Sequence, residues 1–249
     1  MARALSRTLA LLGVGMLLPG IAFAQEIPRV NVSIGGARGP HDVAATLQII
    51  LLLTVLSLAP AILLTLTSFV RVVIVLAFTR SALGIQQVPP NQVIIGLALF
   101  LTFFLMQPVW KEINSQALQP YLAHQITLDE AVKRGEGPVR AFLFAQTRPK
   151  DLGLFLRLGG VEQPRTRADV PTYVLAPAFL ISELKTAFQM GFMIYVPFLV
   201  IDIVVAVILL SMGMMMLPPV MISLPFKVLL FVMVDGWNLV IQSLMLSFR

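Results

Sequence analysis

The stretch from 176 to 219 constrains this chain more than any other part of the sequence. It is almost wholly apolar, yet it contains the charged side chains Glu183, Lys185 and Asp202. A helix that faced only lipid would not hold them, because a charge in hydrocarbon without a partner or water costs several kcal/mol. The stretch is therefore predicted to face protein or water along part of its length.

The composition places the chain among membrane or membrane-assembly proteins. It is 58% hydrophobic and 12% charged, whereas soluble domains average about 25% charged. Because there is no cysteine, disulfides, thiolate metal sites and thiol nucleophiles are excluded. His41 and His124 are isolated from each other, so no metal or other cofactor is predicted. The net charge of +6 forms no basic cluster with interleaved aromatics, which argues against a nucleic-acid partner.

Residues 1–24 have the three-part pattern of a secretory signal. Arg3 and Arg7 precede the apolar run 9–18, and small residues follow up to Ala24. The alternative, a first membrane helix, is disfavoured because the run is too short to cross about 30 Å of hydrocarbon. We expect cleavage after Ala24 and a mature N-terminus on the far side of the inner membrane.

The segment 25–110 is predicted to hold a lead-in and the first helical hairpin, with uncharged helices over 43–70 and 92–110. Arg71 and Arg80 lie between these helices. Positive charge beside a short loop favours the cytoplasmic side of a membrane, which agrees with a secreted N-terminus.

The segment 111–172 differs in composition, with nine Lys or Arg and seven Asp or Glu. It is interpreted as a polar helical insert on the periplasmic side. Thr127 followed by Glu130 has the spacing of a capping box and predicts the beginning of a helix.

The segment 173–249 is predicted to form a C-terminal helical hairpin with a methionine-rich turn. Pro177 and Pro197 are expected to divide its first half into two spans, or into a span and a re-entrant element. The predicted fold class is thus all-α, with membrane-type helical hairpins and a polar helical insert.

The search for catalytic motifs argues against an enzyme. Ser182 and Lys185 have the serine-x-x-lysine spacing of acylating enzymes, but the companion motifs of those enzymes are absent from the sequence. There is also no metalloprotease helix motif and no phosphate-binding glycine loop.

Five charges in the apolar C-terminal segments have two interpretations. They act as an ion or proton relay, or they pair between helices or subunits so that each partner offsets the desolvation of the other. Glu183 and Lys185 cannot face each other, since they are two residues apart on one helix. Pairing is favoured because burial without a partner is so costly. The five residues are Glu183, Lys185, Asp202, Lys227 and Asp235.

Four methionines precede two prolines at the predicted turn. Unbranched thioether side chains commonly fill irregular gaps in a core, and this role is favoured on physical grounds alone. The alternative is a deformable apolar seal around a changing cargo. The four residues are Met212, Met214, Met215 and Met216.

The stretch PAFLISELKTAFQMGFMIYVPFLVIDIVVAVILLSMGMMMLPP, followed by FKVLLFVMVDGWNLVIQSL, closely resembles the two signature stretches of the FliP family of flagellar biosynthetic proteins. The leader, the first hairpin and the polar insert are similar to the family as well. The resemblance implies a noncatalytic core subunit of the flagellar type III export gate, homologous to gate subunits of injectisomes.

The resemblance also implies the partners and location of the chain. Several copies, five by the usual picture, would join FliQ and FliR and further export-apparatus subunits in a helical ring. Unfolded flagellar proteins would pass through its channel, in the inner membrane at the flagellar basal body, with a periplasmic portion. Two other functions stay open from the residues alone: a proton-coupled secondary transporter that uses Glu183 or Asp202, and a passive membrane scaffold.

Residue roles implied by the resemblance follow the family motifs. The methionine cluster 212–216 would line a constriction that closes the resting channel. The five charges would hold helices or subunits together.

Overall fold

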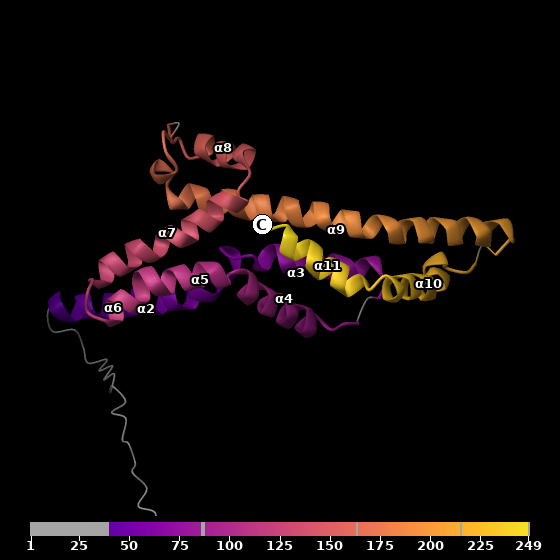
Figure 1. Cartoon of the computed structure of the whole chain (residues 1–249), viewed down its shortest axis with the longest axis horizontal. Helices are drawn as coiled ribbons and strands as arrows, with labels where there is room; N and C mark the ends of the chain where they lie inside the picture. The colour runs from indigo at the N-terminus through magenta and orange to yellow at the C-terminus, as the bar shows by residue number, and fades with distance from the viewer. Residues whose placement is uncertain (1–39, 86–87, 163, 215, 249) are drawn as a thin grey trace, which may run out of the picture. The chain divides into compact units, whose positions relative to one another are not determined.

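The structure, a computed structural model, describes residues 40–85, 88–162, 164–214 and 216–248. The chain divides into two compact units, 1–50 and 51–249, and of the first unit only residues 40–50 are described. The predicted leader and its cleavage site after Ala24 lie outside the described residues. Where the structure is described, every regular element is a helix and no strand occurs (Figure 1), which confirms the all-α fold class.

Ten α-helices are described, and most are joined by short connections. A π-helical turn (Asn114–Leu118) separates α5 from α6, and a 3-10 turn (Arg167–Asp169) precedes α9. In chain order the α-helices are α2 (Pro40–Thr65), α3 (Phe69–Ala82), α4 (Asn91–Leu105), α5 (Gln107–Ile113), α6 (Gln119–Leu122), α7 (Leu128–Gln146), α8 (Pro149–Leu158), α9 (Thr172–Ser211), α10 (Pro219–Met233) and α11 (Gly236–Leu246).

Helix α9 is one continuous helix of 40 residues, so the prediction that Pro177 and Pro197 divide this segment is wrong. At 1.5 Å per residue it is about 60 Å long, roughly twice the thickness of the hydrocarbon core of a bilayer. A proline inside a helix costs about 3 kcal/mol through a lost hydrogen bond and a clash with the preceding turn. The packing of α9 against α3, α7, α8 and α10 opposes this cost.

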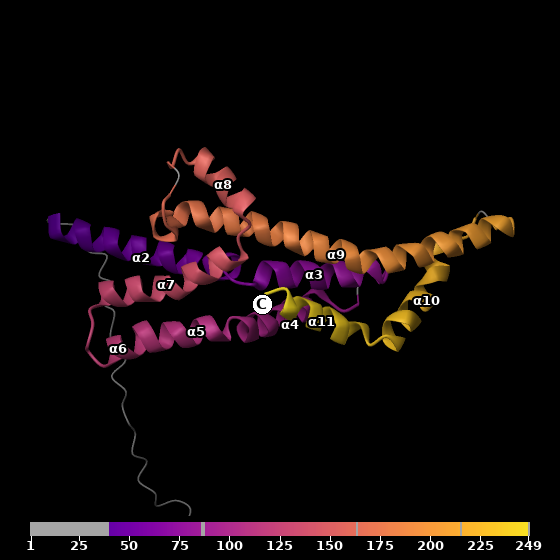
Figure 2. The same ribbon diagram turned by 45° about the horizontal axis from the view of Figure 1, so that its top comes forward.

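Helices α3 and α9 pack closely along the larger core of the second unit. Figure 2 shows them side by side, with α10 turning back from the C-terminal end of α9. Val72, Val75 and Leu76 of α3 are buried in the same cluster as Ala187 of α9. Next to this cluster Gly191 allows a close approach of the two helices, since a Cβ there would stand 2.5 Å from a ring atom of Phe78.

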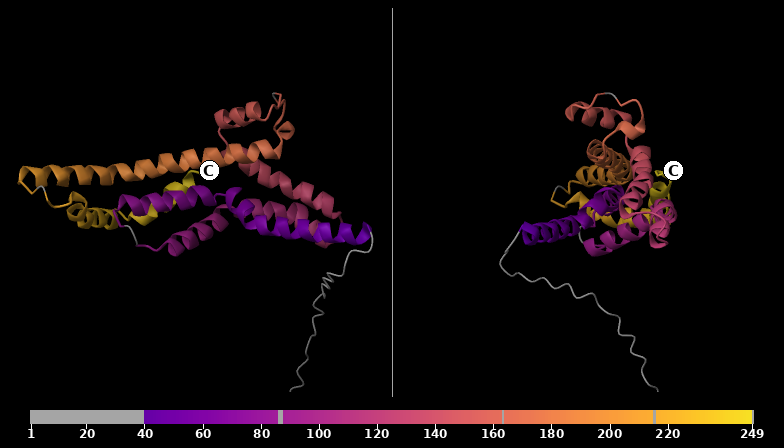
Figure 3. Two further views of the ribbon diagram at one scale, coloured as in Figure 1. Left: turned by 180° about the vertical axis from the view of Figure 1, so that it is seen from behind. Right: turned by 90° about the vertical axis from the view of Figure 1, so that its left-hand side faces the viewer.

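A smaller core fixes the polar segment 111–172 to the N-terminal half of α9. Leu143 of α7 is buried with Val174 and Phe179 of α9, and α8 also contacts α9 (Figure 3). Helix α7 begins as predicted: Thr127 is its N-cap and the Thr127 Oγ1 accepts a hydrogen bond from the backbone N–H of Glu130 at 3.3 Å. The predicted insert is therefore packed on the long helix through an apolar face of its own.

Two apolar helical segments are bent. The helix expected over 92–110 breaks at Met106, where the helical direction bends by 54°, and it bends by 64° between α10 and α11. The second break coincides with Asp235, whose φ of 51° ends the regular helix. Among the described residues α9 alone is long and apolar enough to cross a membrane, or up to three spans exist if each bent pair is counted as one.

Candidate functional site

Arg71 of α3 and Glu183 of α9 form a buried bidentate ion pair. The Nε of Arg71 donates to Oε2 of Glu183 at 2.9 Å, and its Nη2 pairs with Oε1. Both side chains are buried. Two parallel N–H···O bonds give this pairing both energy and a defined orientation, so the pair fixes α3 and α9 against each other.

The remaining donors of Arg71 reach the end of the chain and α7. Its Nη1 donates to the carbonyl oxygen of Ser247 at 2.8 Å, and Nη2 donates to Oε1 of Gln146 at 3.0 Å. The guanidinium lies 3.8 Å from the ring centroid of Phe248, within reach of a cation–π attraction. Arg71 thus joins α3, α7, α9 and the C-terminal residues in one buried network.

Sequence reasoning missed the role of Arg71, which was interpreted as a charge beside a cytoplasmic loop. In the structure Arg71 lies within α3 and its side chain is buried. Only Arg80, at the end of α3, lies near the loop, where it donates to Oδ1 of Asn91 at 2.6 Å. A single arginine flanked by valines inside an apolar run was the available signal. A partner such as Gln146 or Ser247 carried no signal of its own.

Lys185 pairs with Asp151 of α8. Asp151 is buried, its Oδ1 contacts the Nζ of Lys185, and its Oδ2 lies 3.0 Å from the Oγ of Ser182. Ser182 also accepts the backbone N–H of Arg148 at 3.0 Å. The hydrogen bond from Lys185, followed by that from Ser182, holds the pKa of Asp151 below its ordinary value although burial opposes this.

The contacts of Ser182 and Lys185 argue against a nucleophilic site at the serine-x-x-lysine spacing. The ammonium of Lys185 is engaged by Asp151, and the Ser182 hydroxyl is buried among backbone and carboxylate partners. A serine nucleophile also needs access to substrate, and Ser182 is fully buried. The spacing instead positions the N-terminal half of α9 against α8.

Asp202 of α9 pairs with Lys227 of α10. The Nζ of Lys227 donates to Oδ2 of Asp202 at 2.6 Å, and the Oγ of Ser223 donates to Oδ1 at 2.5 Å. Lys227 is buried, and its Nζ lies 3.9 Å from the place where a Cβ of Gly84 would stand, at the C-terminal end of α3. Helix C-termini favour cations, so the lysine has two sources of stabilisation. The pair ties the two arms of the hairpin together.

Asp235 differs from the other four charges. It is exposed, adopts a left-handed conformation before α11, and accepts a hydrogen bond from Asn238 at 3.1 Å. No ion pair within the described ranges includes it. Its carboxylate makes no hydrogen bond to the backbone N–H groups at the start of α11.

The methionine-rich turn joins α9 to α10. The N–H of Met214 donates to the carbonyl of Leu209 at 2.9 Å and that of Gly213 to Leu210 at 3.0 Å, with Gly213 at φ 76°. This is the Schellman arrangement that closes a helix C-terminus, and it requires a residue tolerant of positive φ. Met212, Met214 and Met216 are exposed, and Met215 lies outside the described residues.

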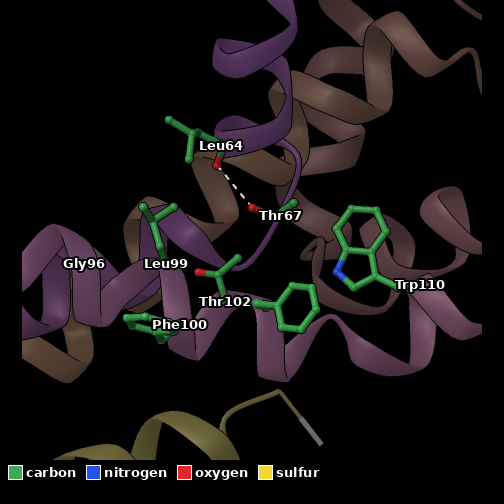
Figure 4. A pocket seen from close by; sticks show the side chains of 8 residues that line it. Leu64, Thr67, Gly96, Leu99, Phe100, Thr102 and Trp110 are labelled. Atoms are coloured by element: carbon green, nitrogen blue, oxygen red, sulfur yellow. Dashed lines mark hydrogen bonds between the residues drawn. The ribbon is translucent and has the colours of Figure 1, made fainter. Parts of the chain in front are cut away.

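An apolar concavity lies between the end of α2 and the bend after α4. Its volume is about 560 Å³, and Leu64, Leu99 and Phe100 contribute to its wall (Figure 4). The Thr67 and Thr102 hydroxyls in the wall are directed to backbone carbonyls. The concavity thus offers mainly surface for apolar contact, although the indole Nε1 of Trp110 in its lining is a buried donor without a hydrogen-bond partner.

Metal binding receives no support from the part of the chain that is described. There, no group of three or more His, Cys, Asp and Glu side chains is placed to hold an ion. His124 lies in the turn between α6 and α7.

The fold and the paired charges define a class of protein: a membrane-associated, all-helical subunit in which ion pairs position apolar helices.

The sequence matches the FliP family over residues 52–244. It is 56% identical over 217 residues to the flagellar biosynthetic protein FliP of Bacillus subtilis, covering 87% of this chain and 98% of that protein. The corresponding protein of Caulobacter vibrioides is 50% identical, with 94% and 86% covered.

A third relative, the flagellar biosynthetic protein FliP of Pectobacterium carotovorum, is 47% identical over 95% of this chain and 92% of its own length. The chain belongs to the FliP family. It is a component of the flagellar export apparatus, with a structural role and not an enzymatic one.

Proposed function

We propose that this chain is one of several copies, five by the family picture, that form a protein-conducting gate with FliQ and FliR. Unfolded flagellar proteins would pass through the central channel of this ring. The assembly belongs in the inner membrane at the flagellar basal body, with the segment 111–172 on the periplasmic side and the leader removed after Ala24. Family membership over residues 52–244 is the observation that carries the proposal.

The paired charges support a subunit of a larger assembly. Because Asp202 and Lys227 neutralise each other inside the hairpin, the outer faces of α9 and α10 are left largely apolar, with exposed Val204, Val207 and Leu229. Apolar surface of this extent marks contact with lipid or with other subunits.

The exposed methionine turn supports a constriction formed by Met212, Met214, Met215 and Met216. Flexible thioether side chains from several copies can close an axis against water and still adapt to different cargo. The turn stands at the end of the hairpin, so that copies arranged around an axis can bring their turns together.

The ion pairs also weigh against a proton-coupled transporter. A relay needs a carboxylate free to take up and release a proton, whereas Glu183 and Asp202 are held by Arg71 and Lys227. A passive scaffold would need no exposed apolar turn. Both rivals are therefore less well supported than the gate.

The test replaces the four methionines of the turn with alanine in the full chain, assembled with FliQ and FliR in lipid vesicles. We expect assembly of unchanged mass and a several-fold rise in ion conductance. Met193→Ala with Met233→Ala, on the faces of α9 and α10, is the matched control and should leave the conductance unchanged. Unaltered conductance of the assembled turn variant would overturn the seal.

A further inference from the structure

Met212, Met214 and Met216 of the turn are exposed, and the sequence contains no cysteine. Met216 is 98% exposed, whereas Met106 in the core is 1% exposed. Oxidants usually react first with thiolates, but this sequence has none. The exposed thioethers are therefore the most readily oxidised groups that the chain offers to water.

The chemistry needs only a peroxide. A lone pair of the thioether sulfur attacks one oxygen of hydrogen peroxide, so that an S–O bond forms as the O–O bond breaks and hydroxide leaves. The proton on the transferred oxygen then moves to the hydroxide, and the products are a sulfoxide and water. The sulfur is oxidised by two electrons and the peroxide is reduced by two. The product is polar and chiral where the thioether was flexible and apolar, and sulfoxide reductases reverse the change.

Position distinguishes the turn from other exposed methionines. Met193 and Met233 are 73% and 75% exposed in the isolated chain, but they lie within the apolar helices α9 and α10. In the membrane or against neighbouring subunits these helix faces are dry, and a polar molecule such as peroxide is depleted from such surroundings. The turn extends beyond the last residue of α9. In the proposed ring it would face the water on either side of the closed constriction.

We propose that the turn between α9 and α10 is a site of reversible methionine oxidation, at which peroxide converts Met212, Met214 and Met216 to sulfoxides and opens the seal. The opening of the seal by oxidation rests on the proposed constriction. Because each copy in a ring contributes its own turn, partial oxidation of each chain places several polar groups at the axis.

The first experiment maps oxidation in the assembled complex in membrane vesicles. After treatment with hydrogen peroxide, the chain is digested and each methionine peptide is quantified by mass spectrometry. We expect sulfoxide at the turn to form several-fold faster than at Met193 and Met233, and slowest at Met106. Equal rates at the turn and at the two helix-face methionines would overturn the site.

The second experiment measures ion conductance of the same vesicles before peroxide, after peroxide, and after sulfoxide reductases. The conductance should rise after peroxide and return to its initial value after treatment with the reductases. A variant with leucine at the four turn methionines keeps nearly the same volume and has no thioether there to oxidise, so peroxide should leave its conductance at the value measured before treatment, whatever that value is. A peroxide-induced leak that persists in the leucine variant contradicts the inference.

The two experiments separate this inference from the proposed function. If the turn is oxidised selectively but its alanine variant does not leak, the modification site stands and the constriction is wrong. If the alanine variant leaks but oxidation shows no preference for the turn, the constriction stands and the modification site is wrong.

Discussion

Arg71 on α3 and Glu183 on α9, separated by 112 residues in sequence, meet in a buried bidentate ion pair. The guanidinium also binds the carbonyl of Ser247, so the pair is covered by the end of the chain. A buried pair of this kind adds little net stability over an apolar pair, but the loss of one partner leaves an uncompensated charge. The arrangement therefore specifies how α3, α9 and the C-terminal residues meet.

Glu183→Ala should lower the free energy of unfolding by about 3–5 kcal/mol, because it leaves the Arg71 guanidinium buried and unpaired. The double variant Arg71→Met with Glu183→Leu should recover at least part of this loss. Thermal unfolding of the detergent-solubilised chain, followed by circular dichroism, measures both. The exposed pair of Glu130 and Arg134 is the control, since Glu130→Ala should cost at most about 1 kcal/mol. Equal losses for the two alanine variants would contradict the prediction.

Asp151 predicts a specific pH dependence. Its hydrogen bonds to Lys185 and Ser182 lower its folded-state pKa below the ordinary value of 3.8. Folding therefore favours the ionised carboxylate, and this contribution is present above about pH 4 and is lost as the pH falls through the folded-state pKa. Unfolding midpoints measured between neutral and acidic pH should separate wild type from Asp151→Asn most above pH 4.

The difference in unfolding midpoint between wild type and Asp151→Asn should shrink as the pH falls below about 4. Glu162→Gln removes an exposed carboxylate from the same segment and is the control. A constant difference between wild type and Asp151→Asn down to acidic pH would show that Asp151 acts through something other than its charge.

Exchange of Asp202 and Lys227 distinguishes pairing from a proton relay. Asp202→Lys or Lys227→Asp alone places two like charges in the hairpin and should cost at least as much as loss of a buried partner, about 3–5 kcal/mol. The double exchange restores opposite charges. It should recover the amount of the protein in the membrane and part of the motility of cells that carry it. Asp235→Asn, at an exposed position, is the control and should leave both unchanged. A double exchange no better than the single variants would favour a role for the carboxylate itself.

The cysteine-free sequence makes the predicted orientation directly testable. Lys150→Cys, exposed at the start of α8, should react with a membrane-impermeant maleimide in spheroplasts. Ser81→Cys, exposed at the end of α3, should react only after lysis, because the Arg80 loop is predicted to be cytoplasmic. Labelling of both variants before lysis, or of the Ser81→Cys variant alone, would contradict the predicted orientation.

The C-terminal hairpin illustrates how far the sequence reaches. Hydrophobicity is a local property, so the length of the apolar segment and its turn at residues 212–218 were predictable. The continuity of α9 through Pro177 and Pro197 was not, since local propensity penalises proline in a helix. Packing of α9 against α3, α7, α8 and α10 stabilises the helix and opposes that penalty.

The charges show the same division. The rule that a buried charge needs a partner follows from solvation alone, and it predicts partners beyond the helix for Glu183 and Lys185. In the structure Glu183 pairs with Arg71 and Lys185 pairs with Asp151. Which residue meets each of them depends on how distant helices pack. Arg71 resembled a loop charge and Asp151 was one of many charges in the polar segment, so neither partnership had a sequence signature.

By itself the sequence determined the family, the all-α class, the apolar character of the C-terminal hairpin and the presence of charges that require partners. These properties depend on composition, periodicity and motif, which are present in the unfolded chain. Only the tertiary structure decided that Arg71 meets Glu183, that Asp151 meets Lys185, and that the long helix is unbroken. Contacts between residues far apart in sequence, with their burial and geometry, exist only once the helices have packed.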